Sequence, residues 1–431
     1  MKIAYLRNSK RGSISVFLVV VFACMITIAA VLFAGAKASA GRSMTDASLQ
    51  LAGRSVLSEY DRRLLSDYGL IAFRGDEERI EDAITYYAEA SLSPKNPLYL
   101  LFRGGGERTI SQNTKCQSVT ANLKGYSLLD LDIFESQIES AVLSELFGSL
   151  GGRKKEFTGS SNGKTSRDDG YGRCLRDRSV IATLPSHGFT SPTILSFGGI
   201  SDITNSENLV DSGKSIVAVS EYVFSIFGNH VDGAKEDHFF GNEVEYLIAG
   251  KFDDEANYSD VKGRIVAMRL ILNNISIATD SKKMGIINTL ALASAAVSGE
   301  SLYEVFKIAY MEAWVAAETA NDIKLLENGD KVALHKTPSH WATQNLEEII
   351  KGISGTKIVY PANKGGQTYK DYLRIMLAVL DRETKYLRMM DLMQINLKGT
   401  YYEEFLMREH YVGYRFSCIV DGDTYAYEEK Y

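Results

Sequence analysis

The sequence predicts a predominantly helical α+β protein with a single transmembrane helix near its N-terminus. Residues 12–36 contain no charged side chain, apolar residues recur at helical spacing through most of the second half, and the tail from Tyr411 to Tyr427 alternates around an Asp-Gly turn at Asp421. The chain has 431 residues, of which 45% are hydrophobic and 24% charged, as is typical of globular proteins. The formal net charge of −6 argues against general nucleic-acid binding, so no nucleic-acid partner is expected.

The uncharged segment is long enough to cross a membrane. An α-helix over residues 13–36 would be roughly 36 Å long, and a bilayer's hydrocarbon core is about 30 Å thick. Residues 1–12 form a basic leader that carries Lys2, Arg7, Lys10 and Arg11. The positive-inside rule predicts a cytoplasmic N-terminus and an extracytoplasmic location for the remaining chain, and therefore a single-pass protein of the cell membrane.

Three processing outcomes are compatible with this N-terminus. The junction between Gly12 and Ser13 resembles the site cut by prepilin peptidases, which remove a short basic leader. Without cleavage, the helix would serve as a signal anchor. Signal peptidase could instead cut after the Ala-Ser-Ala sequence at residues 38–40. Pilins carry Glu at the fifth mature position, where this chain has Phe17, so entry into a filament by the usual contact is in question.

Beyond the membrane helix, the pattern divides the chain into three regions. Apolar residues at three- and four-residue steps predict an amphipathic stalk over residues 37–70, in one helix that runs from about 13 to 67. Residues 71–240 are expected to be a mixed α/β region containing an exposed flexible loop at 148–178. Residues 241–431 are expected to be mainly helical, with the C-terminal hairpin.

Individual elements follow from local signals. A helix over 76–93, a strand over 115–126 and a helix from Asp130 or Asp132 through Leu146 are expected in the mixed region. In the helical region, the expected helices begin at Asp253 or Asp254, at 281, at 301 and at 369, and end near 277, 298, 329 and 397. The third should pack through an alanine-rich seam made of Leu302, Phe306, Ala309, Ala313, Ala316, Ala320 and Ile323.

No catalytic motif stands out. No nucleophile elbow, zinc helix or EF-hand loop occurs, and the glycine-rich segment at 159–165 is one residue short of a phosphate loop. Glu243 and Glu245 are predicted to lie at the solvent-exposed start of a helix. We therefore expect a protein that is not an enzyme and that uses no cofactor or metal.

Two groups of residues remain as candidate sites. The candidates for a metal site share one polar loop and are His230, Asp232, Asp237 and His238, although solubility alone would explain them. Cys24 lies in the membrane helix, and three cysteines lie beyond it, so at most one intramolecular pair forms there. Cys116 and Cys174 flank the flexible loop and are the candidate disulfide.

Several stretches resemble an uncharacterised family of Gram-positive bacteria, domain-of-unknown-function family 5702. The most specific are residues 12–17 and 58–70, and further ones are 127–138, 221–224, 243–250, 369–374 and 391–396, with Trp314, Glu318 and Asp322. The resemblance covers nearly the whole chain outside the 148–178 loop. Proteins of this family are similar to products of tight-adherence (Tad) pilus and secretion loci, and the resemblance brings no catalytic residues.

The resemblance implies a pseudopilin-like, membrane-anchored envelope protein. Its expected partners are the membrane, a prepilin peptidase and other components of a Tad pilus or secretion system. The alternative is a cell-surface binding protein or adhesin with a signal anchor, and a third hypothesis is an envelope hydrolase that uses the loop between His230 and His238.

Overall fold

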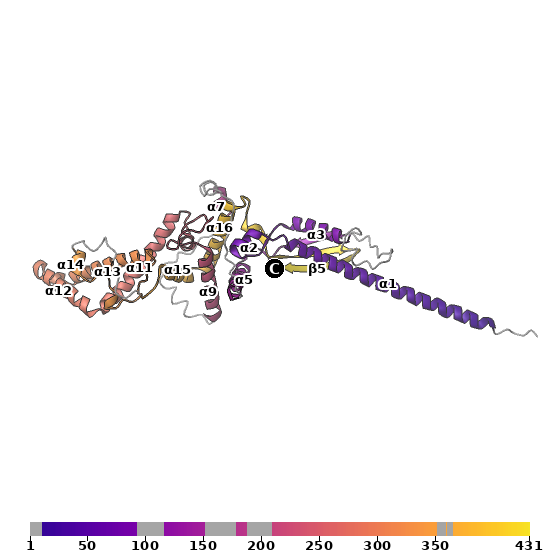
Figure 1. Cartoon of the computed structure of the whole chain (residues 1–431), viewed down its shortest axis with the longest axis horizontal. Helices are drawn as coiled ribbons and strands as arrows, with labels where there is room; N and C mark the ends of the chain where they lie inside the picture. The colour runs from indigo at the N-terminus through magenta and orange to yellow at the C-terminus, as the bar shows by residue number, and fades with distance from the viewer. Residues whose placement is uncertain (1–10, 93–115, 151–177, 188–208, 351–358, 360–364) are drawn as a thin grey trace, which may run out of the picture. The chain divides into compact units, whose positions relative to one another are not determined.

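The computed structural model describes residues 11–92, 116–150, 178–187, 209–350, 359 and 365–431 (Figure 1). Contacts divide the chain into two compact units. Unit 1 contains the described parts of 1–61, 71–127 and 409–431, and unit 2 those of 62–70 and 128–408. The predicted α+β, mainly helical class is confirmed, but the boundary expected near residue 240 lies inside unit 2.

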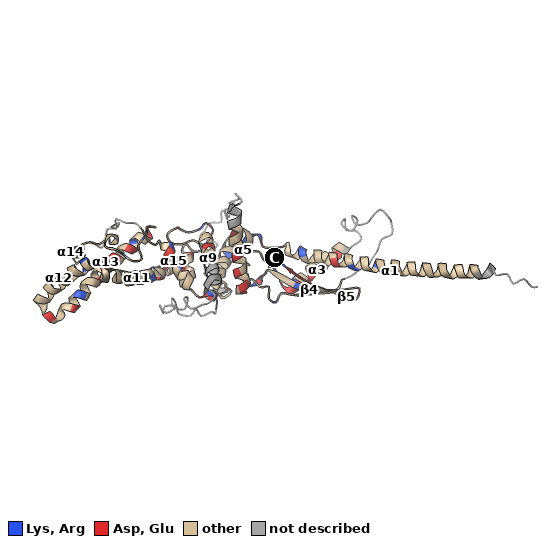
Figure 2. Ribbon diagram, turned by 90° about the horizontal axis from the view of Figure 1, so that it is seen from below, with Lys and Arg blue, Asp and Glu red and all other residues tan. Residues whose placement is uncertain are grey.

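Unit 1 is built on the long helix α1 (Arg11–Leu57). Residues 14–40 are exposed all round the helix, and from Gly41 onward one face is buried. Figure 2 shows the exposed half as a stretch almost free of charged residues. Among the residues that the structure describes, one helix is thus long and apolar enough to be a membrane anchor or a signal sequence, as the sequence predicted.

The predicted continuous helix to residue 67 is wrong. α1 ends at Leu57, and a separate helix α2 (Arg62–Tyr68) follows. Between them Tyr60 forms a bridge with Phe73, and the Asp61 amide donates to the Ala72 carbonyl at 2.8 Å. These contacts replace the i→i−4 bonds that would have continued the helix.

The rest of unit 1 packs on the C-terminal half of α1. An antiparallel sheet has the order β2 (Cys116–Asn122), β4 (Gly413–Val420) and β5 (Asp423–Lys430), while β1 (Phe73–Arg74) pairs with β3 (His410–Tyr411). Helix α3 (Glu77–Leu92) completes the core, which includes Leu49, Ala52, Val56, Ile80, Ile84 and Phe416. A Cβ at Gly53 would lie 2.8 Å from the Phe416 ring, so α1 and β4 approach closely.

The C-terminal hairpin and the helix from residue 77 confirm the predictions made for them. Asp421 and Gly422 have φ angles of 52° and 85° and form a two-residue turn between β4 and β5. Positive φ at both turn residues is the conformation that matches the twist of the flanking strands.

The cysteine pairing differs from the prediction. Cys116 on β2 forms a disulfide with Cys418 on the neighbouring strand β4, with Cα atoms 6.7 Å apart. Cys174 lies outside the described residues, as does most of the 148–178 loop. Sequence proximity suggested Cys174 as the partner, whereas strand pairing brings together residues 302 positions apart.

Unit 2 is helical. Besides α2 it contains α5 (Leu131–Leu150), α7 (Arg178–Ala182), α9 (Leu209–Ile226), α10 (Glu243–Ala249), α11 (Asp254–Thr279), α12 (Ser281–Ser298), α13 (Tyr303–Glu327), α14 (Leu346–Ile350), α15 (Tyr369–Val379) and α16 (Arg382–Thr400). Asp130 and Asp253 cap α5 and α11 as predicted, since their carboxylates accept amide hydrogens of the first turn. The single helix expected over 369–397 is wrong, because Asp381 caps a new helix by accepting from the Thr384 amide at 3.1 Å.

Helix α13 buries a different face from the one predicted. Ala309, Ala316 and Ala320 of the expected seam are exposed, while Trp314, Glu318 and Asp322 are fully buried. The spacing of small apolar residues predicted the wrong face because Glu318 and Asp322 are buried against cationic partners. The sequence pattern does not reveal those partners.

Those partners form a buried ionic network. Arg269 on α11 donates from Nε and Nη2 to one oxygen of Asp322 at 3.1 and 2.9 Å. The Lys336 ammonium lies 2.5 Å from the other oxygen of Asp322 and also contacts Glu318. Two cations and two carboxylates therefore neutralise one another inside unit 2, and the Lys336 ammonium also lies over the Trp341 ring.

Candidate functional site

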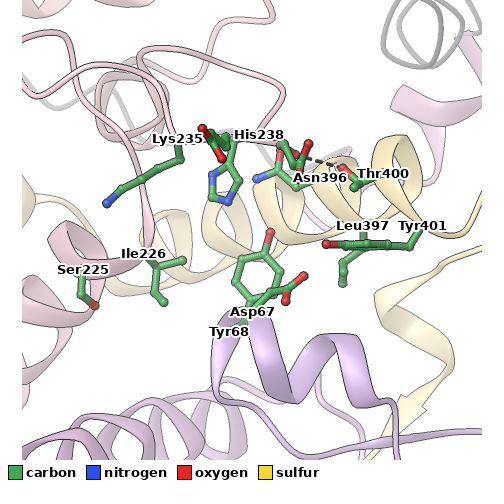
Figure 3. A pocket seen from close by; sticks show the side chains of 12 residues that line it. Asp67, Tyr68, Ser225, Ile226, Lys235, His238, Asn396, Leu397, Thr400 and Tyr401 are labelled. Carbon is green, nitrogen blue, oxygen red and sulfur yellow. Dashed lines mark hydrogen bonds between the residues drawn. The ribbon is translucent and has the colours of Figure 1, made fainter. Parts of the chain in front are cut away.

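A cavity of about 250 Å³, lined by both polar and apolar side chains, lies within unit 2 (Figure 3). The C-terminal ends of α2, α9 and α16 and the loop after α9 enclose it. Its lining side chains are Asp67, Tyr68, Ser225, Ile226, Lys235, Glu236, Asp237, His238, Asn396, Leu397, Thr400 and Tyr401. Cavities for drug-sized ligands are roughly 300–1,000 Å³, so this one suits a smaller molecule.

His238 is held by a buried carboxylate. Glu243 has no exposed surface, and one of its oxygens lies 2.7 Å from His238 Nδ1 and 2.9 Å from the Gly228 amide. Its other oxygen accepts from the Asn396 amide at 2.8 Å. A carboxylate bonded in this way makes His238 Nδ1 the donor and fixes the orientation of the ring.

Tyr68 forms the opposite wall. Its ring lies 6.5 Å from that of His238, and Figure 3 shows its hydroxyl directed toward His238 and Asn396. Burial, and next the negative charge of Glu243, raises the pKa of Tyr68 well above its ordinary value. The hydroxyl therefore stays protonated at physiological pH and remains a hydrogen-bond donor. The Tyr222 hydroxyl fixes the wall by donating to the Tyr68 carbonyl at 2.6 Å.

The rim of the cavity is acidic. Asp67, Glu236 and Asp237 line it with one lysine, Lys235. Such a lining favours a small ligand that carries a cationic group or several hydroxyl groups over an anion. The nearby hydroxyls of Ser225 and Thr400 donate to backbone carbonyls, at 2.8 and 3.0 Å.

The structure places the four predicted metal candidates in different surroundings. His230 stacks on Tyr258 with ring centroids 3.7 Å apart, and Asp232 pairs with Lys370 at 2.5 Å. His238 bonds to Glu243, and Asp237 adopts a left-handed backbone at the cavity rim. Among the described residues, no three His, Cys, Asp or Glu side chains are grouped so that they could hold a metal ion.

A second buried carboxylate, Glu245, lies two residues after Glu243 on α10. One oxygen of Glu245 accepts from the Tyr369 hydroxyl at 2.8 Å and from the His230 amide at 3.0 Å, and the other has no hydrogen-bond partner in the described segments. Burial raises the pKa of Glu245 to about 7. Burial likewise raises the pKa of Asp391 to about 6, although its oxygens accept from Tyr246 and Ser186.

Sequence reasoning missed the central residues of the site. Glu243 and Glu245 were expected at a solvated helix start, but both are fully buried. Tyr68 and Asn396 were not singled out as site residues. The available signal was the otherwise apolar segment from Val244 to Ile248, which Glu243 precedes and Glu245 interrupts, because acids that share a segment with core residues need buried partners.

The predicted processing residues, Gly12 and Ser13, fall in the first turn of α1. The basic leader before Arg11 lies outside the described residues. Phe17 is exposed on the apolar half of the helix.

No curated protein and no solved structure is significantly similar to this chain. The family resemblance noted in the sequence extended to residues 12–17 and 58–70, whereas the region that matches begins only at residue 180. This region includes the loop with His238, the ionic network and α16. Residues 180–422, more than half of the sequence, match the family of unknown function DUF5702, and the chain belongs to that family.

Proposed function

We propose that this protein is a non-catalytic, membrane-anchored envelope protein that acts as a pseudopilin-like or accessory component of a Tad-type pilus or secretion system. The observation that supports this best is the division of α1. Its first half is apolar and exposed on every side, and its second half is the spine of an antiparallel sheet domain. A pilin-type subunit has this arrangement.

The proposed topology places the N-terminus in the cytoplasm and the remaining chain outside the membrane. Basic residues precede the apolar half of α1, which supports that orientation. The disulfide between Cys116 and Cys418 supports it independently, since disulfides persist in oxidising compartments and are rare in the cytosol.

An accessory role fits better than a role as the main filament subunit. Phe17 occupies the position where pilins carry the glutamate that contacts a neighbouring subunit's amino terminus. The partners we propose are the membrane, a prepilin peptidase and other Tad components.

Deletion of the gene tests this function. We expect fewer surface pili or weaker adhesion, restored by the wild-type gene. Restoration by a gene in which Lys2, Arg7, Lys10 and Arg11 are replaced by Ala should fail, because the orientation signal is lost. Normal pili, adhesion and secretion in the deletion strain would contradict the proposal.

The cavity favours a second candidate, a cell-surface binding protein. Its walls are preformed, since Glu243 holds His238 and Tyr222 holds Tyr68. A His238→Ala chain that is normally folded and located, but no longer retains a small ligand bound by the wild type, would favour this role. A hydrolase has less support, because the hydroxyls of Ser225 and Thr400 donate to backbone carbonyls rather than to His238.

A further inference from the structure

One face of α12 is exposed and uncharged over nearly its whole length. The buried face of the helix repeats every four residues, at Lys283, Ile287, Ala291 and Ala295, and packs on α13. The opposite face consists of Gly285, Ile286, Thr289, Leu292, Ala293, Ala296 and Val297. Leu292 is 65% exposed and Val297 90% exposed. Figure 1 shows α12 at the end of unit 2 distant from α16.

This face, residues 285–297 of α12, has charges only at its two ends. Lys282 is exposed in the first turn, and Glu300 is exposed just after the last turn. Neither has an ion-pair partner within the described part of the chain. A helix with a cation at one end, an anion at the other and a neutral middle is complementary in charge to an antiparallel copy of itself.

The side-chain sizes show the same complementarity. In two antiparallel copies that meet at the level of Ala291, Gly285 lies opposite Val297 of the second copy, and Ile286 lies opposite Ala296. The same register places Thr289 opposite Ala293 and Lys282 opposite Glu300. Ile286 and Val297 thus each meet a small residue, which permits the close approach that packed helices need, and Leu292 lies opposite the half-buried Leu290 near the centre of the contact.

We propose that α12 is a homodimer interface, through which two copies of this chain pack antiparallel about a two-fold axis. An interface of this kind uses the same surface patch on both subunits, so it requires self-complementarity of the type described above. Lys282 and Glu300 cancel in charge, so the face has no basic cluster of the kind that attracts an anionic lipid surface. The inference does not depend on the proposed function.

Charge reversal tests the interface in the full-length chain in detergent. The molar mass from light scattering should be twice the 47.7 kDa of one chain. Lys282→Glu should weaken dimerisation roughly tenfold, and Lys282→Glu combined with Glu300→Lys should restore it, because each reversed charge again meets its opposite. A double variant that dimerises no better than Lys282→Glu alone would overturn the proposed pairing of Lys282 with Glu300.

Val297→Glu should abolish the dimer, and Ala316→Glu on the exposed face of α13 is the matched control that should keep it. Tryptophan fluorescence reports whether each variant is folded, since both tryptophans lie in unit 2 beside α12. A monomeric wild type, or a dimer that survives Val297→Glu, would overturn the proposal. The second outcome would assign association to another surface, including α1.

Cross-linking gives a result that does not depend on a destabilising variant. In a chain with Cys24→Ser and Cys174→Ser, a mixture of Thr289→Cys and Ala293→Cys proteins should form a disulfide-linked dimer on oxidation, since facing positions of packed helices come within disulfide reach. A mixture of Thr289→Cys and Ala316→Cys should not. Equal yields from the two mixtures would overturn the antiparallel pairing.

Discussion

The buried ionic network of unit 2 predicts a large effect for a single substitution, Lys336→Met. The Lys336 ammonium has almost no exposure and contacts both Glu318 and Asp322. Methionine keeps much of the side-chain volume but removes the positive charge. Asp322 then keeps its ion pair with Arg269, whereas Glu318 loses the ammonium that contacted it.

The expected loss follows from the cost of an unpaired buried charge. Removal of one partner of a buried ion pair destabilises a protein by about 3–5 kcal/mol. Glu318 retains hydrogen bonds from the Ala342 and Thr343 amides, at 3.0 and 2.8 Å, so we expect the lower part of that range. With a urea m-value of about 3 kcal/mol/M, a loss of about 3 kcal/mol moves the unfolding midpoint down by about 1 M.

Tryptophan fluorescence during urea unfolding measures this shift of the midpoint for unit 2. The chain has two tryptophans, and both contact the network region, since Trp314 donates to the Thr343 carbonyl and Trp341 lies beside Lys336. The matched control is Lys251→Met, which removes an exposed pair with Asp260 at 3.3 Å and should cost less than about 1 kcal/mol. Equal midpoints for the two variants would refute the reasoning.

Three further predictions concern other parts of the chain. Burial raises the pKa of Glu245 from 4.5 to about 7, so the folded state keeps a proton that the unfolded state loses. The unfolding free energy should then fall by up to about 3 kcal/mol between pH 4.5 and 7 and stay constant above, and Glu245→Gln should remove this fall in urea titrations at a series of pH values. Gly53→Val should cost about 1–3 kcal/mol by overpacking α1 against the sheet, seen as faster hydrogen exchange of α1 amides, whereas Gly263→Val, with open space around it, should leave exchange in unit 1 unchanged. Cys116 and Cys418 should resist alkylation in cells until reduced, and peptide mapping should find them joined; free thiols at both would contradict an oxidising location.

Local sequence signals predicted much of the fold. Asp130 and Asp253 cap the helices they were expected to begin, and α12 has the predicted bounds of 281 and 298. The Asp-Gly turn at residues 421–422 joins the predicted strands. Each of these depends on residues within one turn or one hairpin, where backbone preferences and capping decide the outcome.

The errors arose where distant residues decide the structure. The break after Leu57 depends on pairing between Tyr60 and Phe73, and the partner of Cys116 is set by a strand 302 positions away. The burial of Glu243 likewise depends on Asn396, and that of Asp322 on Arg269. A single sequence contains no direct record of these pairings. Because charged side chains are mostly exposed in proteins, a charged residue without a known partner is predicted to be exposed.

The division of α1 makes the mature N-terminus the most informative measurement on this protein. All residues from 14 to 40 are exposed, and Gly41 is the buried residue that follows them. Cleavage after the Ala-Ser-Ala sequence at 38–40 would therefore remove the exposed apolar half of α1 and leave the core of unit 1 complete. Loss of folding stability in unit 1 is thus no argument against cleavage by signal peptidase at this position. The apolar stretch is nevertheless longer than the 7–15 residues of a signal-peptide core, which favours its retention. We expect mass spectrometry of the envelope-associated protein to find a chain that begins at Ser13 or keeps its leader. A chain that begins at Gly41 would contradict the membrane anchor and, with it, the pseudopilin-like role.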